Sequence, residues 1–302
     1  FEDKPFNFDA WDINIYYQDK MWEINDVEGV ELVEDGPVRT SLRIKRKFLD
    51  SVISQTVILY NDIPRIDFKT EIDWKEKHIL LKAAFPVDIH SDKATYDIQF
   101  GNVERPTHWN TSWDYARFEV CAHKWADLSE DDYGVSLLND CKYGYDIKDG
   151  VMRITLLKSA TYPNEDADRE THEFTYSLYP HMGGWRSGNT VQMAYSLNCP
   201  LYGHVEEAHP GSLPSQMSMA HVNRENVILE TIKKAEDSND IIIRLYECYN
   251  RRTKATLEFF TELSEVHECD LMENETKAVP VSGKAFEFEL MPYEIKTFKL
   301  KI

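Results

Sequence analysis

Hydrophobic and polar residues alternate with a period of two along most of this chain. The clearest run, 64–74, carries Ile66, Phe68, Thr70, Ile72 and Trp74 on one face and Arg65, Asp67, Lys69, Glu71 and Asp73 on the other. Strand side chains point alternately to two faces, so this run predicts a half-buried antiparallel strand. Helical spacing rarely lasts beyond two turns, and the fold class is therefore predicted to be all-β. Similar runs predict strands at 96–100, 152–156, 174–178, 191–197, 241–245, 286–290 and 298–302.

Proline, glycine and serine gather between residues 199 and 225, a composition typical of a loop or linker. The part after it holds about five or six strand-like runs, enough for a small sandwich. We therefore predict a large β-sandwich domain at 1–205, a linker at 206–225 and a small C-terminal β-sandwich domain at 226–302.

The charge of the chain narrows the choice of partners. It carries 34 basic and 53 acidic residues, a net charge of −19. A field of this sign repels phosphate backbones and anionic membranes, so we expect neither a nucleic acid nor a membrane as partner. A neutral sugar would be indifferent to it.

The five cysteines are widely spaced and form no C-x-x-C motif. Their odd number favours a reducing compartment over a disulfide-stapled secreted domain, and we expect a cytoplasmic protein. The chain starts at Phe1 without a methionine. We expect this to be an internal position of a longer polypeptide.

Common catalytic motifs are missing from the sequence, including H-E-x-x-H, G-x-S-x-G and the phosphate-binding P-loop. His204 and His209 are five residues apart, which puts them on different faces of a helix or strand, so a surface loop is the favoured interpretation. Asp127 and Glu130 could serve as the two carboxylates of glycoside hydrolysis, although turn or edge structure is favoured. We assign no catalytic residue and no metal ligand in this chain.

The stretch from Arg105 to Asp114 combines hydrogen-bonding side chains with two tryptophans between two predicted strands. Sugar recognition requires such a mixture, because hydroxyls need polar partners and ring faces need flat apolar ones. In the alternative, Arg105 and Asp114 pair to brace a long loop while the tryptophans pack beneath it. The candidate substrate-binding residues are Arg105, His108, Asn110, Trp113 and Asp114.

Several stretches resemble the C-terminal region of glycoside hydrolase family 38 α-mannosidases, of the cytosolic and vacuolar type and its bacterial relatives. The resemblance covers nearly the whole chain, and its longest words are eight residues or more in the same order. The matching words are 105–108, 110–114, 123–130, 133–140, 142–145, 176–181, 226–237 and 244–247.

This resemblance implies a large β-supersandwich of the galactose-mutarotase-like kind followed by a small β-sandwich. It also implies an N-terminal catalytic barrel and a helical region in the same polypeptide. That barrel would hold zinc or another divalent metal together with the catalytic carboxylates, and would act on mannose-containing glycans with retention of configuration.

The leading hypothesis is the C-terminal portion of an α-mannosidase, which scaffolds the catalytic barrel and contributes carbohydrate contacts. By itself such a chain is expected to be inactive and to expose a broad apolar patch where the barrel docks. One alternative is a stand-alone carbohydrate-binding module that uses the aromatic loop. Another is a metal hydrolase built on the loop from His204 to His209.

Overall fold

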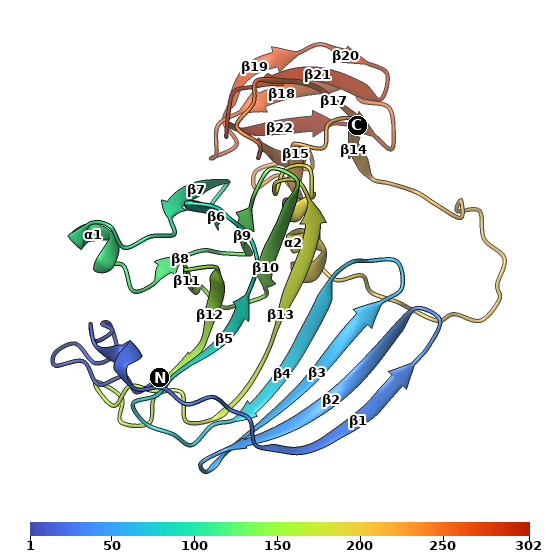
Figure 1. The fold of residues 1–302 in the computed structure, drawn as a ribbon. Coiled ribbons are helices and arrows are strands. Elements are labelled where there is room, and N and C mark those ends of the chain that lie inside the picture. The colour runs from blue at the N-terminus through green and yellow to red at the C-terminus, as the bar shows by residue number, and fades with distance from the viewer. The chain divides into compact units, whose positions relative to one another are not determined.

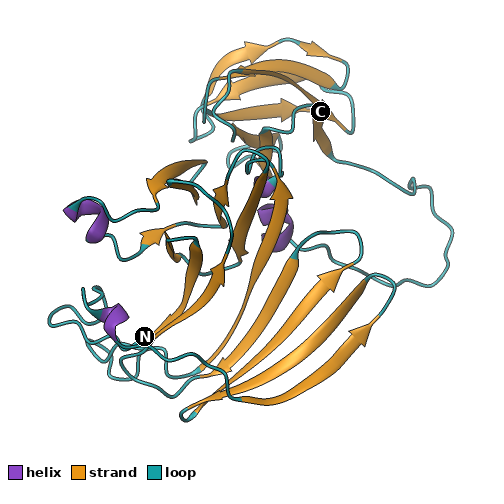
Figure 2. Ribbon diagram, in the orientation of Figure 1, coloured by secondary structure: helices purple, strands orange, loops and turns teal.

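The computed structural model describes residues 1–302, and nearly all its regular structure is β-strand, which confirms the predicted all-β class (Figures 1 and 2). The chain forms two compact units. Unit 1 comprises Phe1–Ile98 and Val103–Leu201, and unit 2 comprises Gln99–Asn102 and Tyr202–Ile302. The domain limits at 205 and 226 remain a prediction. The helices are short, namely η1 (Tyr17–Asp19), α1 (Ser112–Tyr115) and α2 (Thr190–Asn198).

Unit 1 contains two antiparallel sheets. In spatial order, the nine-stranded sheet consists of β1 (Val27–Asp35), β2 (Arg39–Phe48), β3 (Ser51–Tyr60), β4 (Ile66–Asp73), β13 (Thr171–Met182), β10 (Tyr133–Asn139), β9 (Trp125–Ser129), β6 (Lys93–Ile98) and β7 (Gly101–Pro106). The four-stranded sheet consists of β5 (Leu80–Pro86), β12 (Val151–Lys158), β11 (Gly144–Lys148) and β8 (Val120–Cys121).

The core of unit 1 lies between these two sheets. Ile72, Leu137 and Tyr176 from the larger sheet pack in one cluster with Tyr145 and Ile154 from the smaller one. This is the arrangement of a β-sandwich, in which the inward-facing residues of both sheets interdigitate.

The polar face of the run 64–74, most of which forms β4, differs from its prediction. Lys69, Glu71 and Asp73 are exposed as expected, but Arg65 and Asp67 are buried and form an ion pair of 2.7 Å. Arg65 also donates a hydrogen bond of 2.9 Å to Ser196 Oγ on α2. The helix covers this end of the strand, and a distant partner of this kind leaves no mark on local periodicity.

The predicted strand at 191–197 is wrong, because these residues form α2. The buried side chains of this helix are Thr190, Val191 and Ala194, spaced three and four residues apart as on one helical face. Over so short a stretch, the apolar residues at 191, 193, 195 and 197 are compatible with the period of a strand and with that of a helix.

One row of side chains leads from the core of unit 1 to open surface. The strand register places Leu32 opposite Leu42, Leu42 opposite Val57, Val57 opposite Phe68, and Phe68 opposite Tyr176. Directly opposed residues share one face of a sheet. Tyr176 is buried, whereas Leu32 is 57% exposed. The core face of the large sheet therefore continues uncovered across β2 and β1.

Unit 2 is a smaller sandwich of two antiparallel sheets. One consists of β15 (Val227–Lys234), β16 (Ile241–Glu247), β22 (Ile295–Lys301), β18 (Glu265–Cys269) and β19 (Glu275–Val279). The other consists of β14 (Ala220–Val222), β17 (Thr253–Phe259), β21 (Ala285–Leu290) and β20 (Val281–Ser282). Its core includes Ile243, Leu257 and Phe298. β14 lies within the predicted linker, and Cys199–Met219 before it has no helix or strand.

Candidate functional site

The loop between β7 and β8 holds four of the five predicted substrate-binding residues, all except Arg105, around the single turn of α1. Thr111 caps this helix, since its side chain accepts a hydrogen bond from the Asp114 N–H. The Thr111 hydroxyl in turn donates to Asp114 Oδ2 at 2.7 Å. This hydrogen bond, followed by the electrostatic interactions with His108 and Arg117, holds the pKa of the Asp114 carboxyl below its usual value.

Arg105 and Asp114 do not pair, so the bracing alternative is wrong in that respect. Asp114 lies 3.4 Å from the guanidinium of Arg117 and 3.7 Å from Nδ1 of His108. Arg105 belongs to β7, and its Nε is buried without a hydrogen-bond partner. The structure brings His108, Asn110 and Asp114 together with Trp113 on one short segment and leaves Arg105 apart.

The two tryptophans of the loop have opposite environments. Trp109 packs edge-on against Tyr115 and lies under the ammonium of Lys148, 5.6 Å from the ring centre. Trp113 is 77% exposed. The flat face of Trp113 is therefore accessible, while Trp109 supports the loop from below.

Lys148 is a residue of this site that the sequence did not single out. Its ammonium on β11 donates hydrogen bonds of 3.1 Å to the carbonyl oxygens of Pro106 and His108. Burial lowers the pKa of Lys148, an effect that the charge of Asp114 partly offsets. Nothing in the sequence indicated this role, because the carbonyl groups that Lys148 binds lie about forty residues earlier.

A second polar cluster, formed by Asp127, Ser136, His181 and Thr190, lies inside unit 1. His181 Nε2 is 2.8 Å from Asp127 Oδ2 and 3.1 Å from Ser136 Oγ, and Ser136 donates to the same carboxylate at 2.8 Å. A nucleophilic triad needs serine and aspartate on different ring nitrogens of the histidine. Here both meet Nε2, and all four residues are buried. The cluster therefore has the geometry of a structural network.

The carboxylates of Asp127 and Glu130 have separate partners. Asp127 belongs to the buried cluster, whereas Glu130 accepts a hydrogen bond of 2.7 Å from the backbone N–H of His90. Asp127 thus bonds to buried residues of the large sheet, whereas Glu130 stabilises a turn at the surface.

Another charged cluster lies on the outer side of the four-stranded sheet. Lys82 makes ion pairs of 2.6 Å with both Glu119 and Asp146, and Arg153 pairs with Asp146 at 2.8 Å. Burial opposes the charge on Lys82, but the two carboxylates outweigh it and raise its pKa. Two cations meet two anions, so the charges balance within the cluster.

No group of three or more histidine, cysteine, aspartate or glutamate side chains is arranged to hold a metal ion. His204 and His209 are exposed, and His204 pairs with Glu206 at 2.8 Å. This donor set does not fit a zinc site, which favours three or four converging ligands. The helices are all too short or too polar to cross a membrane.

Comparison with known proteins shows that this chain is similar to one family of glycosyl hydrolases. Residues 1–166 match the glycosyl hydrolases family 38 C-terminal domain, and residues 226–298 match the family 38 C-terminal beta sandwich domain. The chain is 40% identical to Alpha-mannosidase G of Dictyostelium discoideum and 40% identical to human Alpha-mannosidase 2C1. Each alignment covers 99% of this chain but only 28% and 29% of the relative.

A solved structure shares the fold. The α-mannosidase from Enterococcus faecalis V583 superposes with a TM-score of 0.75 at 18% identity, covering 91% of this chain and 35% of that protein. The chain thus spans less than a third of the curated relatives and about a third of this structure.

Proposed function

The chain belongs to glycoside hydrolase family 38, and on that premise we propose that it is the C-terminal β region of an α-mannosidase that hydrolyses α-mannosidic bonds in glycans. The observation that carries this proposal is the match of two successive family 38 C-terminal domains, one over residues 1–166 and the other over residues 226–298. The relatives that align over the whole chain are named as α-mannosidases.

Scaffolding of the catalytic barrel and helical region is the first part of the proposed role. The row that runs from buried Tyr176 to exposed Leu32 supports it, because this row extends a packed core onto open surface. Val30, beside this row, is 63% exposed. Apolar surface of this kind gains free energy when another part of the polypeptide covers it.

Carbohydrate contact is the second part, and we assign it to His108, Asn110 and Trp113. The exposed ring of Trp113 offers a stacking face, and the exposed amide of Asn110 is able both to donate and to accept. Thr111, Asp114 and Lys148 hold the loop in place and are positioning residues.

The catalytic carboxylates and the zinc or other divalent metal are assigned to the rest of the longer protein, because no donor set in this chain fits such a metal. All five cysteines are free. Free cysteines suit a reducing compartment, so a cytoplasmic location is part of the proposal.

The test is an assay on an aryl α-mannoside with zinc or cobalt added. The longer protein should hydrolyse it, and the isolated chain should stay at the uncatalysed rate. Hydrolysis by the isolated chain that disappears in Glu130→Gln would overturn the assignment. Tight binding of mannan by the isolated chain, with an inactive longer protein, would instead favour the stand-alone carbohydrate-binding module.

A further inference from the structure

The four-stranded sheet of unit 1 has one open edge, at β5. Its spatial order is β5-β12-β11-β8, so β5 pairs with β12 on one side and with no strand of the sheet on the other. The side chain of Lys82 in this strand is only 1% exposed, yet the residue as a whole is not buried. Its accessible part is therefore the main chain, whose hydrogen-bonding groups face the open edge.

The first residues of the chain pair with the beginning of this edge. The backbone N–H of Leu80 donates to the Phe1 carbonyl oxygen at 2.9 Å, and the Phe1 amine donates to the Leu80 carbonyl oxygen at 3.1 Å. Glu2 and Ile79 form an antiparallel bridge next to this pair. In an antiparallel strand, main-chain groups alternate between the two neighbours. The amides of Lys82 and Ala84 therefore point to the same edge as that of Leu80.

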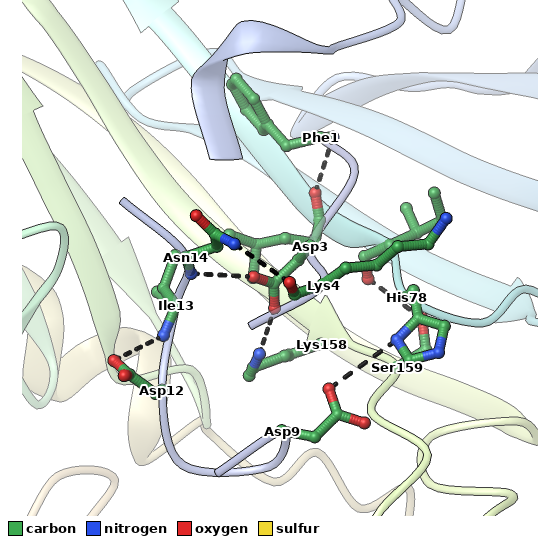
Figure 3. Close-up of polar contacts among 12 residues, drawn as sticks. Phe1, Asp3, Lys4, Asp9, Asp12, Ile13, Asn14, His78, Lys158 and Ser159 are labelled. Carbon is green, nitrogen blue, oxygen red and sulfur yellow. Dashed lines mark hydrogen bonds and ion pairs between the residues drawn. The ribbon is translucent and has the colours of Figure 1, made fainter. Parts of the chain in front are cut away.

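The first residues of the chain are held firmly in this place. Asp3 accepts a hydrogen bond from the Asn14 N–H and pairs with Lys158, while Asp9 lies 3.7 Å from His78 (Figure 3). Phe1 packs against Tyr17, with ring centres 5.4 Å apart. These contacts fix the direction in which the backbone enters at Phe1.

A cavity of about 480 Å³ opens beside the same edge, between the two sheets. Apolar side chains from both sheets line it, including Phe68, Tyr176 and Phe85. Gln55 donates to the Tyr176 hydroxyl at 2.7 Å within it. Core residues of a sandwich are ordinarily covered by the next strand, and β5 is the last strand of the smaller sheet on this side.

We propose that the polypeptide leading into Phe1 in the longer protein continues as an antiparallel strand along the free edge of β5 and closes the cavity between the sheets. The proposal rests on the proposed function only in requiring that such a polypeptide exists. The register set by Phe1 and Leu80 puts the first residue before Phe1 opposite Leu81, the second opposite Lys82 and the fourth opposite Ala84.

This register predicts which of the residues before Phe1 are apolar. Leu81, Ala83 and Phe85 belong to the core cluster or pack against it. Residues directly opposite one another share a face, so the first, third and fifth residues before Phe1 should be apolar and enter the cavity. A polar or proline-rich stretch at these positions would overturn the proposal.

The main experiment compares this chain with the same chain extended by about eight of its natural preceding residues. Hydrogen exchange of the amides of Lys82 and Ala84 should slow at least tenfold in the extended chain. An extended chain with one extra glycine inserted before Phe1 is the matched control, because the shift turns the apolar residues to the other face. Equal exchange rates in the original and extended chains would overturn the proposal.

A proline scan provides a second, independent reading. Ala84→Pro removes the N–H that faces the new strand, so it should lower the Tm more in the extended chain than in the original one. Ala83→Pro removes an N–H that faces β12 and should lower the Tm similarly in both. An identical effect of Ala84→Pro in the two chains would contradict the pairing. Mannosidase activity of the longer protein is assayed separately, so failure of the proposed function and failure of the strand pairing are distinguishable.

Discussion

Two polar clusters of unit 1 contain side chains that suit catalysis or binding, and they differ in what remains accessible. In the buried cluster, Asp127, Ser136 and His181 bond to one another. In the loop cluster, Thr111 and Asp114 bond to each other, while Asn110 and Trp113 face solvent. A ligand needs side-chain atoms that do not already bond to other residues. Which atoms remain accessible is therefore more informative about binding than which residue types are present.

The largest expected effect is that of Asp127→Ala. It leaves the buried side chains of His181 and Ser136 without the carboxylate that they contact, and each buried group left unsatisfied costs about 1–3 kcal/mol. The free energy of unfolding in urea measures it. Glu130→Ala, at the end of the same hairpin, is the control and should cost much less. Similar costs for both would mean that the buried cluster is not a stabilising network.

Gly188→Ala should cost about 1–3 kcal/mol, the usual range for overpacking. A Cβ at Gly188 would lie 2.5 Å from Cγ of His181, whereas a Cβ at Gly184 would meet nothing within 4 Å. Gly184→Ala is the matched control. The clash is with His181, so Gly188→Ala should cost less in a His181→Ala background. Additive costs would show that the strain lies elsewhere.

Thr111→Ala should cost about 1 kcal/mol, a typical value for the loss of a helix cap. It should also raise the pKa of Asp114, because the Thr111 hydroxyl is the main cause of its lowered value. A lowered folded-state pKa contributes stability above the unfolded pKa of about 3.9, and this is lost as pH falls through the folded value. Carboxyl titration by NMR measures the shift. An unchanged pKa would contradict the assigned hydrogen bond.

Asn110→Ala and Trp113→Ala should have the smallest effects on stability, within about 0.5 kcal/mol, since both side chains are exposed. In the longer protein, each should lower kcat/KM for a mannoside about tenfold, which corresponds to about 1.4 kcal/mol. Loss of Tm with unchanged kinetics would transfer these residues from binding to support of the loop. Tyr143→Ala, also exposed but on another turn, is the control.

Local patterns predicted most of the strands, although 191–197 proved to be a helix and 96–100 ends in a turn, and they predicted the long-range contacts poorly. The alternation at 64–74 correctly predicted that Ile72 and Trp74 are buried. It could not place Arg65 inside, because the helix that covers Arg65 contacts it through Ser196, which is 131 residues away. The buried pair of Asp127 and His181 is likewise formed across 54 residues. A sequence pattern records spacing along the chain, whereas these pairs depend on which strands become neighbours.

In the loop between β7 and β8, too, contacts between residues close in sequence were predictable and contacts between distant residues were not. The T-x-x-D spacing of Thr111 and Asp114 is a helix-capping signal that is readable from the sequence. It would have shown that Asp114 is occupied by Thr111 rather than by Arg105. The support from Lys148 was not readable, because it depends on the position of β11. The substrate class came from family resemblance, since alternation and charge carry no information on mannose.

The outer edge of the nine-stranded sheet, formed by β1, affects how the protein aggregates at high concentration. This strand is exposed along almost its whole length, but register shifts interrupt it near Val27 and near Leu32. Charged side chains at Glu28, Glu31 and Glu34 pair with the neighbouring strand. Bulges and charges prevent a free edge from templating another chain. A molecule with a large uncovered apolar sheet thus resists edge-to-edge aggregation, the first step toward fibres.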